Sequence, residues 1–484
     1  MRDALKEKNQ RAELIDFFDE QLMSQRISIA KKRLMHLQNR DGSWSWFEGM
    51  NGSYYITEAV CENLIYLASE DSEVENMMNK GLAFLDREIL EDYYDFKRMN
   101  IDPYPSEQVL RYLYLWAQMP DRKVSNDQKK MRDHYLTKLE KQSKSFTIYG
   151  KANGAFILRA FGRTKKADEF LQSAVEYSIT KPGMGRYYAT DKAEYSWRDY
   201  KIPTQLAAMN AIRHSERTDR PTLLADMQVW LLRQKQSQMW DNPMNTIGAV
   251  QCLIENDKNK EALSNRSLPI FTLDGTRLST PIDTTKFLAE QLGYVKTQVA
   301  DNLIAGGIHQ LNVQSTEALT GDEAFDRGAS SISWGAVYTQ FNEDLNSLKN
   351  QTSGELQITR RIMVDGKDLN RPLKIGDKVI VRLTIKADRD FDFVQIRSQH
   401  PACFEPTNQL SGYRYMGGLG GYVAHHDAST DVFFDRFRKG SVTYDLEFYV
   451  TRTGEYLAGI ATAQCAYAPE FVAHTGGDKV VVGE

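Results

Sequence analysis

The stretch that decides the fold of this chain is Leu34–Leu64, with the sequence LMHLQNRDGSWSWFEGMNGSYYITEAVCENL. It predicts the end of one helix, a loop rich in aromatic residues and glycine, and the start of a second helix. Trp44 in the loop precedes Thr57, and small or apolar residues follow this threonine. We expect the Thr57 hydroxyl to cap the second helix, because threonine is a favourable N-cap residue.

Weaker copies of this helix–loop–helix unit occur further along the chain. Trp197 precedes Thr204 in one copy, and Trp240 precedes Thr246 in another. A repeated unit of this kind indicates an array of helix pairs that share one core. The spacing of apolar residues predicts helices at residues 11–38, 57–67, 75–92, 106–118, 127–144, 148–162, 166–177, 204–214, 221–236 and 246–255, with Ser106 as a further N-cap candidate.

The period of the apolar residues changes after about residue 262. Residues 268–273, followed by Asp274-Gly275, predict a strand that enters a hairpin turn. Residues 378–386 and 441–451 alternate apolar with polar side chains, which indicates half-buried antiparallel strands. Residues 281–292 are expected to form a short helix, and the polar segment 340–355 a domain boundary. The core of the last β-region is expected to contain Val379, Val381, Leu383, Val442, Tyr444 and Leu446.

Several of these segments resemble one protein family. The loop DGSWSWF followed by the helix TEAVCENL resembles the thioester-containing helical domain of bacterial alpha-2-macroglobulins, which is an α/α toroid. Residues 333–338, with the sequence SWGAVY, resemble the strand that follows this toroid. Residues 431–449 and 454–474 resemble the family's C-terminal macroglobulin-type β-domain.

The resemblance implies a multidomain α-plus-β fold, in which an α/α toroid is followed by antiparallel β-sandwich domains. We expect the toroid at residues 1–262, with its N-terminal part missing, and a partial CUB-like β-domain at residues 263–345. A macroglobulin-like β-sandwich is expected at residues 346–484. The partial domain is expected to expose an unpaired strand edge or to borrow a partner strand, because its first part would lie upstream.

Length and composition agree with this organisation. A chain of 484 residues suggests about three domains. The net charge of −4, from 61 basic and 65 acidic side chains, lacks the basic surplus of a nucleic-acid binder. No segment approaches the roughly 18 apolar residues of a membrane span. The start of the chain, MRDALKEKNQRAEL, has no apolar signal core, so we expect the chain to begin inside a larger protein.

The function that the resemblance implies is that of a C-terminal fragment of a bacterial protease trap. In that family a protease cuts a bait segment, the molecule changes shape, and the protease is held. The fragment itself is expected to be non-catalytic and to need no cofactor. Its implied partners are proteases, through the full-length protein, and the upstream domains of the same chain. The implied location is the periplasm or the cell envelope.

The thioester of that family needs the sequence Cys-x-Glu-Gln, in which the cysteine sulfur is joined to the glutamine carbonyl. Glu20-Gln21 is the nearest match here, but Phe17 or Phe18 stands where the sulfur is needed. No cysteine precedes Cys61. We therefore predict no thioester in this chain.

A second interpretation is a polysaccharide lyase or glycoside hydrolase, since those enzymes also combine a toroid with β-sandwiches, and a third is a scaffold or adhesion module. Sugar rings stack on aromatic side chains, and glycoside hydrolysis needs paired carboxylates. The candidates are Trp44, Trp46, Tyr54 and Tyr55 for stacking and Glu48, Glu58, Glu194 and Asp199 for catalysis. Nothing in the sequence pairs these carboxylates, and we favour aromatic anchors of loops on a helical core, with no catalytic residue assigned.

Three further sets of residues are candidates for a chemical function. His425-His426-Asp427 is the only histidine cluster, and we favour an exposed loop over a metal site, because neighbours on a strand point to opposite faces. Met416–Tyr422, with the sequence MGGLGGY, is expected to be a flexible loop rather than a phosphate site, since no helix is predicted after it. Pairing of Cys403 with Cys465 stays open, whereas Cys61 and Cys252 are expected as buried free thiols.

Overall fold

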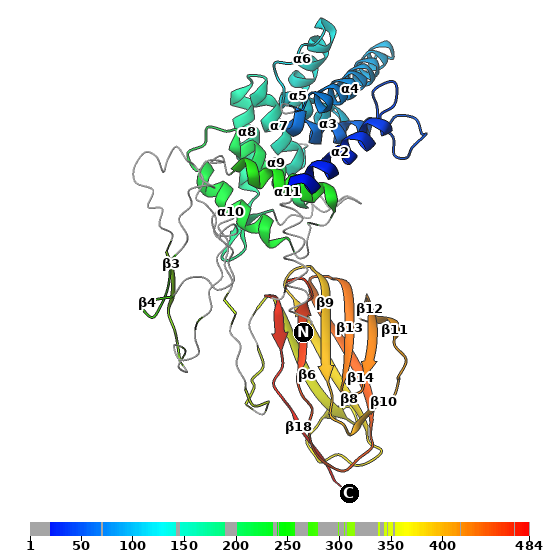
Figure 1. Cartoon of the computed structure of the whole chain (residues 1–484), viewed down its shortest axis with the longest axis vertical. Coiled ribbons are helices and arrows are strands. Elements are labelled where there is room, and N and C mark those ends of the chain that lie inside the picture. Colours follow the sequence, from blue (N-terminus) through cyan, green and yellow to red (C-terminus); the bar gives the residue numbers. More distant parts are fainter. Residues whose placement is uncertain are drawn as a thin grey trace. The chain divides into compact units, whose positions relative to one another are not determined.

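The structure of the chain is a computed structural model, which is shown in Figure 1. It describes residues 20–68, 71–141, 146–188, 201–235, 240, 242–256, 270–278, 299, 304, 307–314, 337–338, 343–345, 347–351, 354–416, 418–468 and 470–483. The chain divides into two compact units. One comprises Met1–Trp230 and Val250–Ser330, and the other comprises Leu231–Ala249 and Ser331–Glu484.

The N-terminal half of the described chain is helical. Its helices are α2 (Glu20–Leu37), α3 (Tyr54–Ala68), α4 (Ser72–Arg98), α5 (Glu107–Ala117), α6 (Asn126–Lys141), α7 (Ile148–Ala160), α8 (Thr164–Glu176), α9 (Lys201–Arg213), α10 (Arg220–Arg233) and α11 (Pro243–Asn256). Each of the ten helices predicted before residue 262 corresponds to one of these, which confirms the periodicity argument for that part of the chain. Ser106 caps α5 as expected, because its hydroxyl accepts the Val109 N–H at 3.3 Å. A small hairpin that we did not predict, β1 (Ile179–Lys181) with β2 (Gly185–Tyr187), follows α8.

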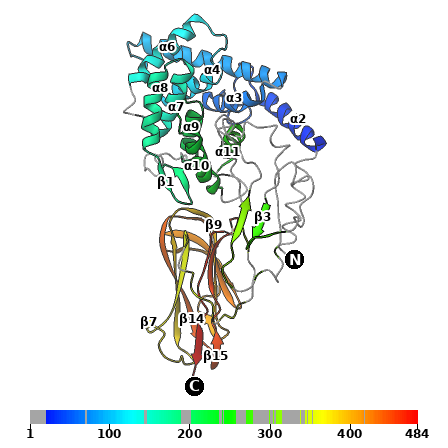
Figure 2. The same cartoon turned by 90° about the vertical axis from the view of Figure 1, so that its left-hand side faces the viewer.

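Consecutive helices of the first unit alternate between two layers. Figure 2 labels α3, α4, α6, α7, α8 and α9 of this unit. Helices α3, α5, α7 and α9 contact one another in that order and form the inner layer. Helices α4, α6 and α8 pack against them from outside. This alternation is the arrangement expected of an α/α toroid, because each helix pair buries its apolar faces on the next pair.

Gly81 allows close packing between the two layers. Gly81 lies inside α4, and a Cβ atom there would stand 2.6 Å from the Cys61 sulfur and 2.8 Å from Cζ3 of Trp44. Such distances are too short for any side chain. Gly81 therefore lets the loop tryptophan and α3 approach the α4 backbone.

The strands after the helices begin with a small sheet in the order β4-β3-β5. Its strands are β3 (Ile270–Leu273), β4 (Thr276–Arg277) and β5 (Leu311–Gln314). The predicted turn is confirmed, since Asp274 and Gly275 both have positive φ, of 48° and 82°. The order leaves β5 at an edge of the sheet within the described residues. The predicted helix at residues 281–292 lies outside them, and the domain boundaries at residues 262 and 345 stay predictions.

The C-terminal strands form a β-sandwich. One sheet has the order β10-β14-β8-β6-β7, the other β11-β12-β13-β9-β16-β17, and β15 pairs with β18. The strands are β6 (Leu356–Val364), β7 (Lys367–Asp368), β8 (Lys378–Ala387), β9 (Phe391–Gln399), β10 (Phe404–Pro406), β11 (Gly412–Met416), β12 (Leu419–His426), β13 (Ser429–Phe437), β14 (Gly440–Val450), β15 (Gly454–Leu457), β16 (Ala461–Cys465), β17 (Val472–His474) and β18 (Lys479–Val482). The paired strands of both large sheets are antiparallel.

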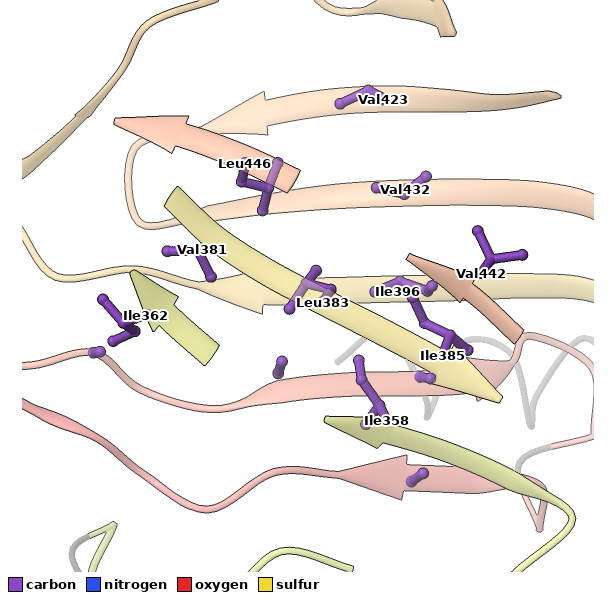
Figure 3. Packing of buried hydrophobic residues seen from close by; sticks show 14 of the residues in the cluster. Ile358, Ile362, Val381, Leu383, Ile385, Ile396, Val423, Val432, Val442 and Leu446 are labelled. Atoms are coloured by element: carbon purple, nitrogen blue, oxygen red, sulfur yellow. The ribbon is translucent and has the colours of Figure 1, made fainter. Parts of the chain in front are cut away.

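Alternate side chains of both sheets meet in one core, which Figure 3 shows from close by. Val381 and Leu383 of β8 lie opposite Leu446 and Tyr444 of β14 in the register of the sheet. Of the six predicted core residues, Val379, Val381, Leu383, Val442 and Leu446 are buried, and Tyr444 packs against them partly buried. The predicted core and the α-plus-β fold class are therefore confirmed.

Candidate functional site

The repeated tryptophan and threonine form the same clasp in both described copies. The Trp44 indole N–H donates to the Leu34 carbonyl at 3.0 Å, and the Trp44 backbone N–H donates to the Thr57 hydroxyl at 2.9 Å. In the other copy, the Trp240 indole donates to the Leu231 carbonyl at 2.7 Å. The Trp240 backbone N–H donates to the Thr246 hydroxyl at 3.0 Å. Trp197, from the third copy, lies outside the described residues.

The clasp corrects the expectation that these threonines cap their helices. Thr57 lies inside α3, where its hydroxyl donates to the Ser53 carbonyl at 2.8 Å, four residues earlier. The residue that caps α3 is Ser53, whose hydroxyl accepts the Ile56 N–H at 3.4 Å. In α11, Asn242 is the cap and accepts the Asn245 N–H at 2.9 Å. A threonine placed one turn into a helix bonds back to the preceding carbonyl, and this leaves its oxygen free to accept the N–H of the loop tryptophan.

The aromatic side chains of the first loop have two different environments. Trp44 is buried in the clasp and cannot stack on a ligand. Trp46 is exposed and stacks on Tyr55, with 5.8 Å between ring centroids and 14° between ring planes. The Arg111 guanidinium of α5 lies 4.8 Å from the centre of the Tyr55 ring. The loop is therefore anchored on the inner helices by a buried tryptophan and by a cation–π contact.

Glu58 is buried in the interior of the helical unit rather than in an open cleft. Its Oε2 lies 2.9 Å from Arg111 Nε, and its Oε1 is buried without a hydrogen-bond partner among the described residues. Burial raises the pKa of the Glu58 carboxyl to about 8, although Arg111 opposes the shift. For Arg111, burial acts to lower the pKa, but Glu58, Tyr149, Glu62 and Tyr55 together outweigh burial, and the pKa is raised. The geometry is that of a structural pair, since neither group is accessible to a substrate.

The other catalytic candidates do not join Glu58 in the described residues. Glu48 is exposed and contacts Arg33 Nη2 at 3.4 Å and His36 Nε2 at 3.0 Å. Glu194 and Asp199 lie outside the described residues. Sequence reasoning missed Arg111 as the partner of Glu58, although an arginine within the apolar run VLRYLYLWA of α5 was a signal for a buried cation.

The segment proposed for the thioester is described only from Glu20 onward. Glu20 and Gln21 begin α2, and Gln21 is exposed. Phe17 and Phe18 lie outside the described residues. The absence of a thioester from this chain stays a prediction.

Two expected loops of the sandwich are strands instead. His425 and His426 end β12, where His425 Nδ1 lies 3.2 Å from the Thr430 hydroxyl and His426 Nε2 lies 3.7 Å from Asp431 Oδ2. Met416–Tyr422 includes the turn between β11 and β12 and part of each strand. Alternating glycines did not predict a strand, but the register places the Tyr415 side chain against Gly420 and covers it. Among the described residues, no group of three His, Cys, Asp or Glu side chains is arranged to hold a metal ion.

All four cysteines are buried free thiols. Pairing of Cys403 with Cys465, which the sequence left open, therefore does not occur. Burial raises the pKa of the Cys61 and Cys465 thiols to about 12 in each case, and this keeps both unreactive. None of the described helices is both long enough and apolar enough to cross a membrane.

Comparison with known proteins gives one family match and several similar structures. Residues 355–470 match the model of the bacterial alpha-2-macroglobulin MG10 domain. A structure of Escherichia coli alpha-2-macroglobulin activated by porcine elastase is similar over 96% of this chain and 39% of that chain, at 13% identity and a TM-score of 0.40. The trypsin-activated Escherichia coli protein is similar over 96% of this chain and 30% of that chain, at 14% identity and a TM-score of 0.40.

A Salmonella alpha-2-macroglobulin reacted with methylamine is similar over 93% of this chain and 27% of that chain, at 15% identity and a TM-score of 0.34. This chain thus spans less than half the length of each of these structures. No curated protein matches it.

Proposed function

Because this chain carries the MG10 domain of a bacterial alpha-2-macroglobulin, we propose that it is the C-terminal part of a protease trap. The observation that carries the proposal is the family match of residues 355–470, which covers most of the C-terminal sandwich. Similar Escherichia coli proteins are described as activated by elastase and by trypsin. In this proposal the partners are proteases, captured by the full-length protein, and the upstream domains of the same chain.

In this proposal the chain contributes domains that move and surfaces on which other domains pack, and it contributes no catalytic group. The sandwich has a hydrophobic core of its own, so it can move from contact with one domain to contact with another without unfolding. The aromatic loops of the helical unit are held by buried clasps, which suits a rigid body that moves as a whole. The proposed location is the periplasm or cell envelope, where a trap meets foreign proteases.

The test compares two substrates of one protease. The full-length protein that contains this chain is mixed with elastase or trypsin, and hydrolysis of a large protein substrate and of a small peptide substrate is then measured. A trap excludes the large substrate from the held protease but admits the small one. We expect loss of hydrolysis of the large substrate alone.

The control is the present chain by itself, which is expected to change neither rate. Equal inhibition of both substrates would indicate an active-site inhibitor instead of a trap. Unchanged hydrolysis of both substrates, with the full-length protein cleaved, would contradict the proposal.

A further inference from the structure

The helical unit contains a cavity where the C-terminal ends of its inner helices converge. Its volume is about 450 Å³. The wall includes Tyr66 of α3, Gln118 directly after α5, Phe156 of α7, Asn210 of α9 and Glu255 of α11. Pockets for small ligands typically have about 300–1,000 Å³. The cavity is therefore of a size that admits a small organic molecule.

The charged groups in this wall already have protein partners. Glu255 pairs with Arg213, whose Nη2 also donates to the Cys252 carbonyl at 3.0 Å. Arg159, which also lines the cavity, pairs with Asp168. An ionic ligand would lose its hydration on entering the cavity, and no unpaired charge of opposite sign in the wall would offset this cost. The balance of charge thus favours a neutral ligand.

The remaining wall combines polar and apolar surface. Gln118 Nε2 is buried and has no hydrogen-bond partner among the described residues, so a rotation of this side chain into the cavity would give a ligand oxygen a donor. The Phe156 ring packs edge-on against His214, with 5.1 Å between centroids, and contributes an apolar wall. Tyr66 also lines the cavity and is 38% exposed, so part of its aromatic side chain is accessible.

We propose that this cavity binds a neutral ring that bears hydroxyl groups, such as a hexose or an N-acetylhexosamine. Such a ring has an apolar face that stacks on an aromatic side chain, and it has oxygens that accept from Gln118 and donate to Glu255. The proposal is independent of protease trapping. It concerns binding alone, because no pair of carboxylates lines the cavity among the described residues.

The test uses the whole chain and four probes that share one ring. Glucose and N-acetylglucosamine are neutral, glucosamine is cationic and glucuronate is anionic. Ligand-observed NMR saturation transfer and titration calorimetry measure their Kd values. We expect the neutral sugars to bind and the two charged sugars to bind at least tenfold more weakly.

Two variants and one control assign the binding to the cavity. Ala160→Trp fills the space from the wall, and Tyr66→Ala removes the exposed ring. Tyr94→Ala is the control, because Tyr94 has the same 38% exposure but lies on the outer helix α4. We expect Kd to rise at least tenfold in both cavity variants and to stay unchanged in the control. If Ala160→Trp unfolds the chain, the Kd of Tyr66→Ala alone decides whether the sugars bind in the cavity.

Three results would each overturn the proposal. The first is no binding of either neutral sugar at about 10 mM, where a Kd in the millimolar range is still detected. The second is binding that Tyr66→Ala leaves unchanged. The third is tighter binding of a charged sugar, because this would show that the paired charges do not set the specificity.

Discussion

Arg360 is a buried arginine that connects several segments of the C-terminal sandwich, and its removal makes a sharp test of the structure. It lies on β6 with only 1% of its side chain exposed. Its Nη2 and Nε donate to Asp478 Oδ2 at 2.8 and 3.0 Å. The same guanidinium donates to the carbonyls of Gly459 at 2.6 Å and Ala458 at 3.2 Å. One charged group thus ties together β6, the segment before β16 and the segment before β18.

The expected cost of Arg360→Met follows from these contacts. Breaking a buried ion pair by removing one partner costs about 3–5 kcal/mol, because the other partner is left buried and unpaired. Here Asp478 is 46% exposed, so water can hydrate its carboxylate, and we expect the lower end, about 3 kcal/mol. For a domain of this size, such a loss lowers the midpoint of thermal unfolding by roughly 10 °C.

The chain supplies a matched control in the next residue. Arg361 is also bound to an aspartate through two nitrogens, with Nη2 2.6 Å from Asp368 Oδ2, but both side chains are more than half exposed. We expect Arg361→Met to change the stability of the sandwich far less than Arg360→Met, because exposed ion pairs are screened by water.

The assay separates the sandwich from the helices by spectroscopy. Five of the seven tryptophans lie before residue 231 in the first compact unit, so tryptophan fluorescence reports mainly on that unit, whereas circular dichroism reports on both units. Urea unfolding of both variants is followed by the two signals. An equal decrease in the free energy of unfolding for Arg360→Met and Arg361→Met would refute the reasoning. A decrease seen only in the unfolding transition followed by fluorescence would also refute it.

Three further predictions concern packing, pH and autonomy. Gly81→Ala is expected to destabilise the helical unit by about 1–3 kcal/mol, because the new methyl group collides with Cys61 and Trp44. This cost outweighs the better helix propensity of alanine. Urea unfolding followed by tryptophan fluorescence measures the change, and a stabilised variant would contradict the prediction. Burial lowers the pKa of His400 below its ordinary value of 6.5, so the unfolded chain binds the proton more readily than the folded chain. The contribution of His400 to the free energy of unfolding is therefore fully present above pH 6.5 and is lost as the pH falls below it. His400→Phe should flatten this acid dependence of the sandwich in urea unfolding, and an unchanged slope would count against it. Residues 350–484 expressed alone should unfold in one cooperative thermal transition, since their core is closed, and the lack of such a transition would mean that the boundary is wrong.

The sequence alone predicted each helix and the core of the sandwich, because these follow from local periodicity. Apolar residues at helical spacing place one face of each helix inside. The period-two pattern of residues 378–386 likewise places Val379, Val381 and Leu383 on the inner face of β8. The long C-terminal motif also predicted the macroglobulin domain, which the family match over residues 355–470 confirms.

The function of the repeated threonine was decided only by tertiary structure. Sequence spacing placed Thr57 near the start of a helix, and capping was the local interpretation. Its hydroxyl instead serves the backbone of Trp44, 13 residues earlier, because the loop folds back over the first turn. The strand that contains Gly420 was not predicted for a similar reason. The ring that covers Gly420 belongs to Tyr415 on the neighbouring strand, and the local sequence does not show this contact.

The candidate sites depend on contacts between residues that are far apart in the chain. Glu58 meets Arg111 across two inner helices, and Glu255 meets Arg213 in the same way. Each glutamate taken alone is a plausible catalytic or binding group. The sequence determined which helices carry these side chains. The packing of those helices determined which charges neutralise one another, because the pairing depends on distances that no local pattern encodes.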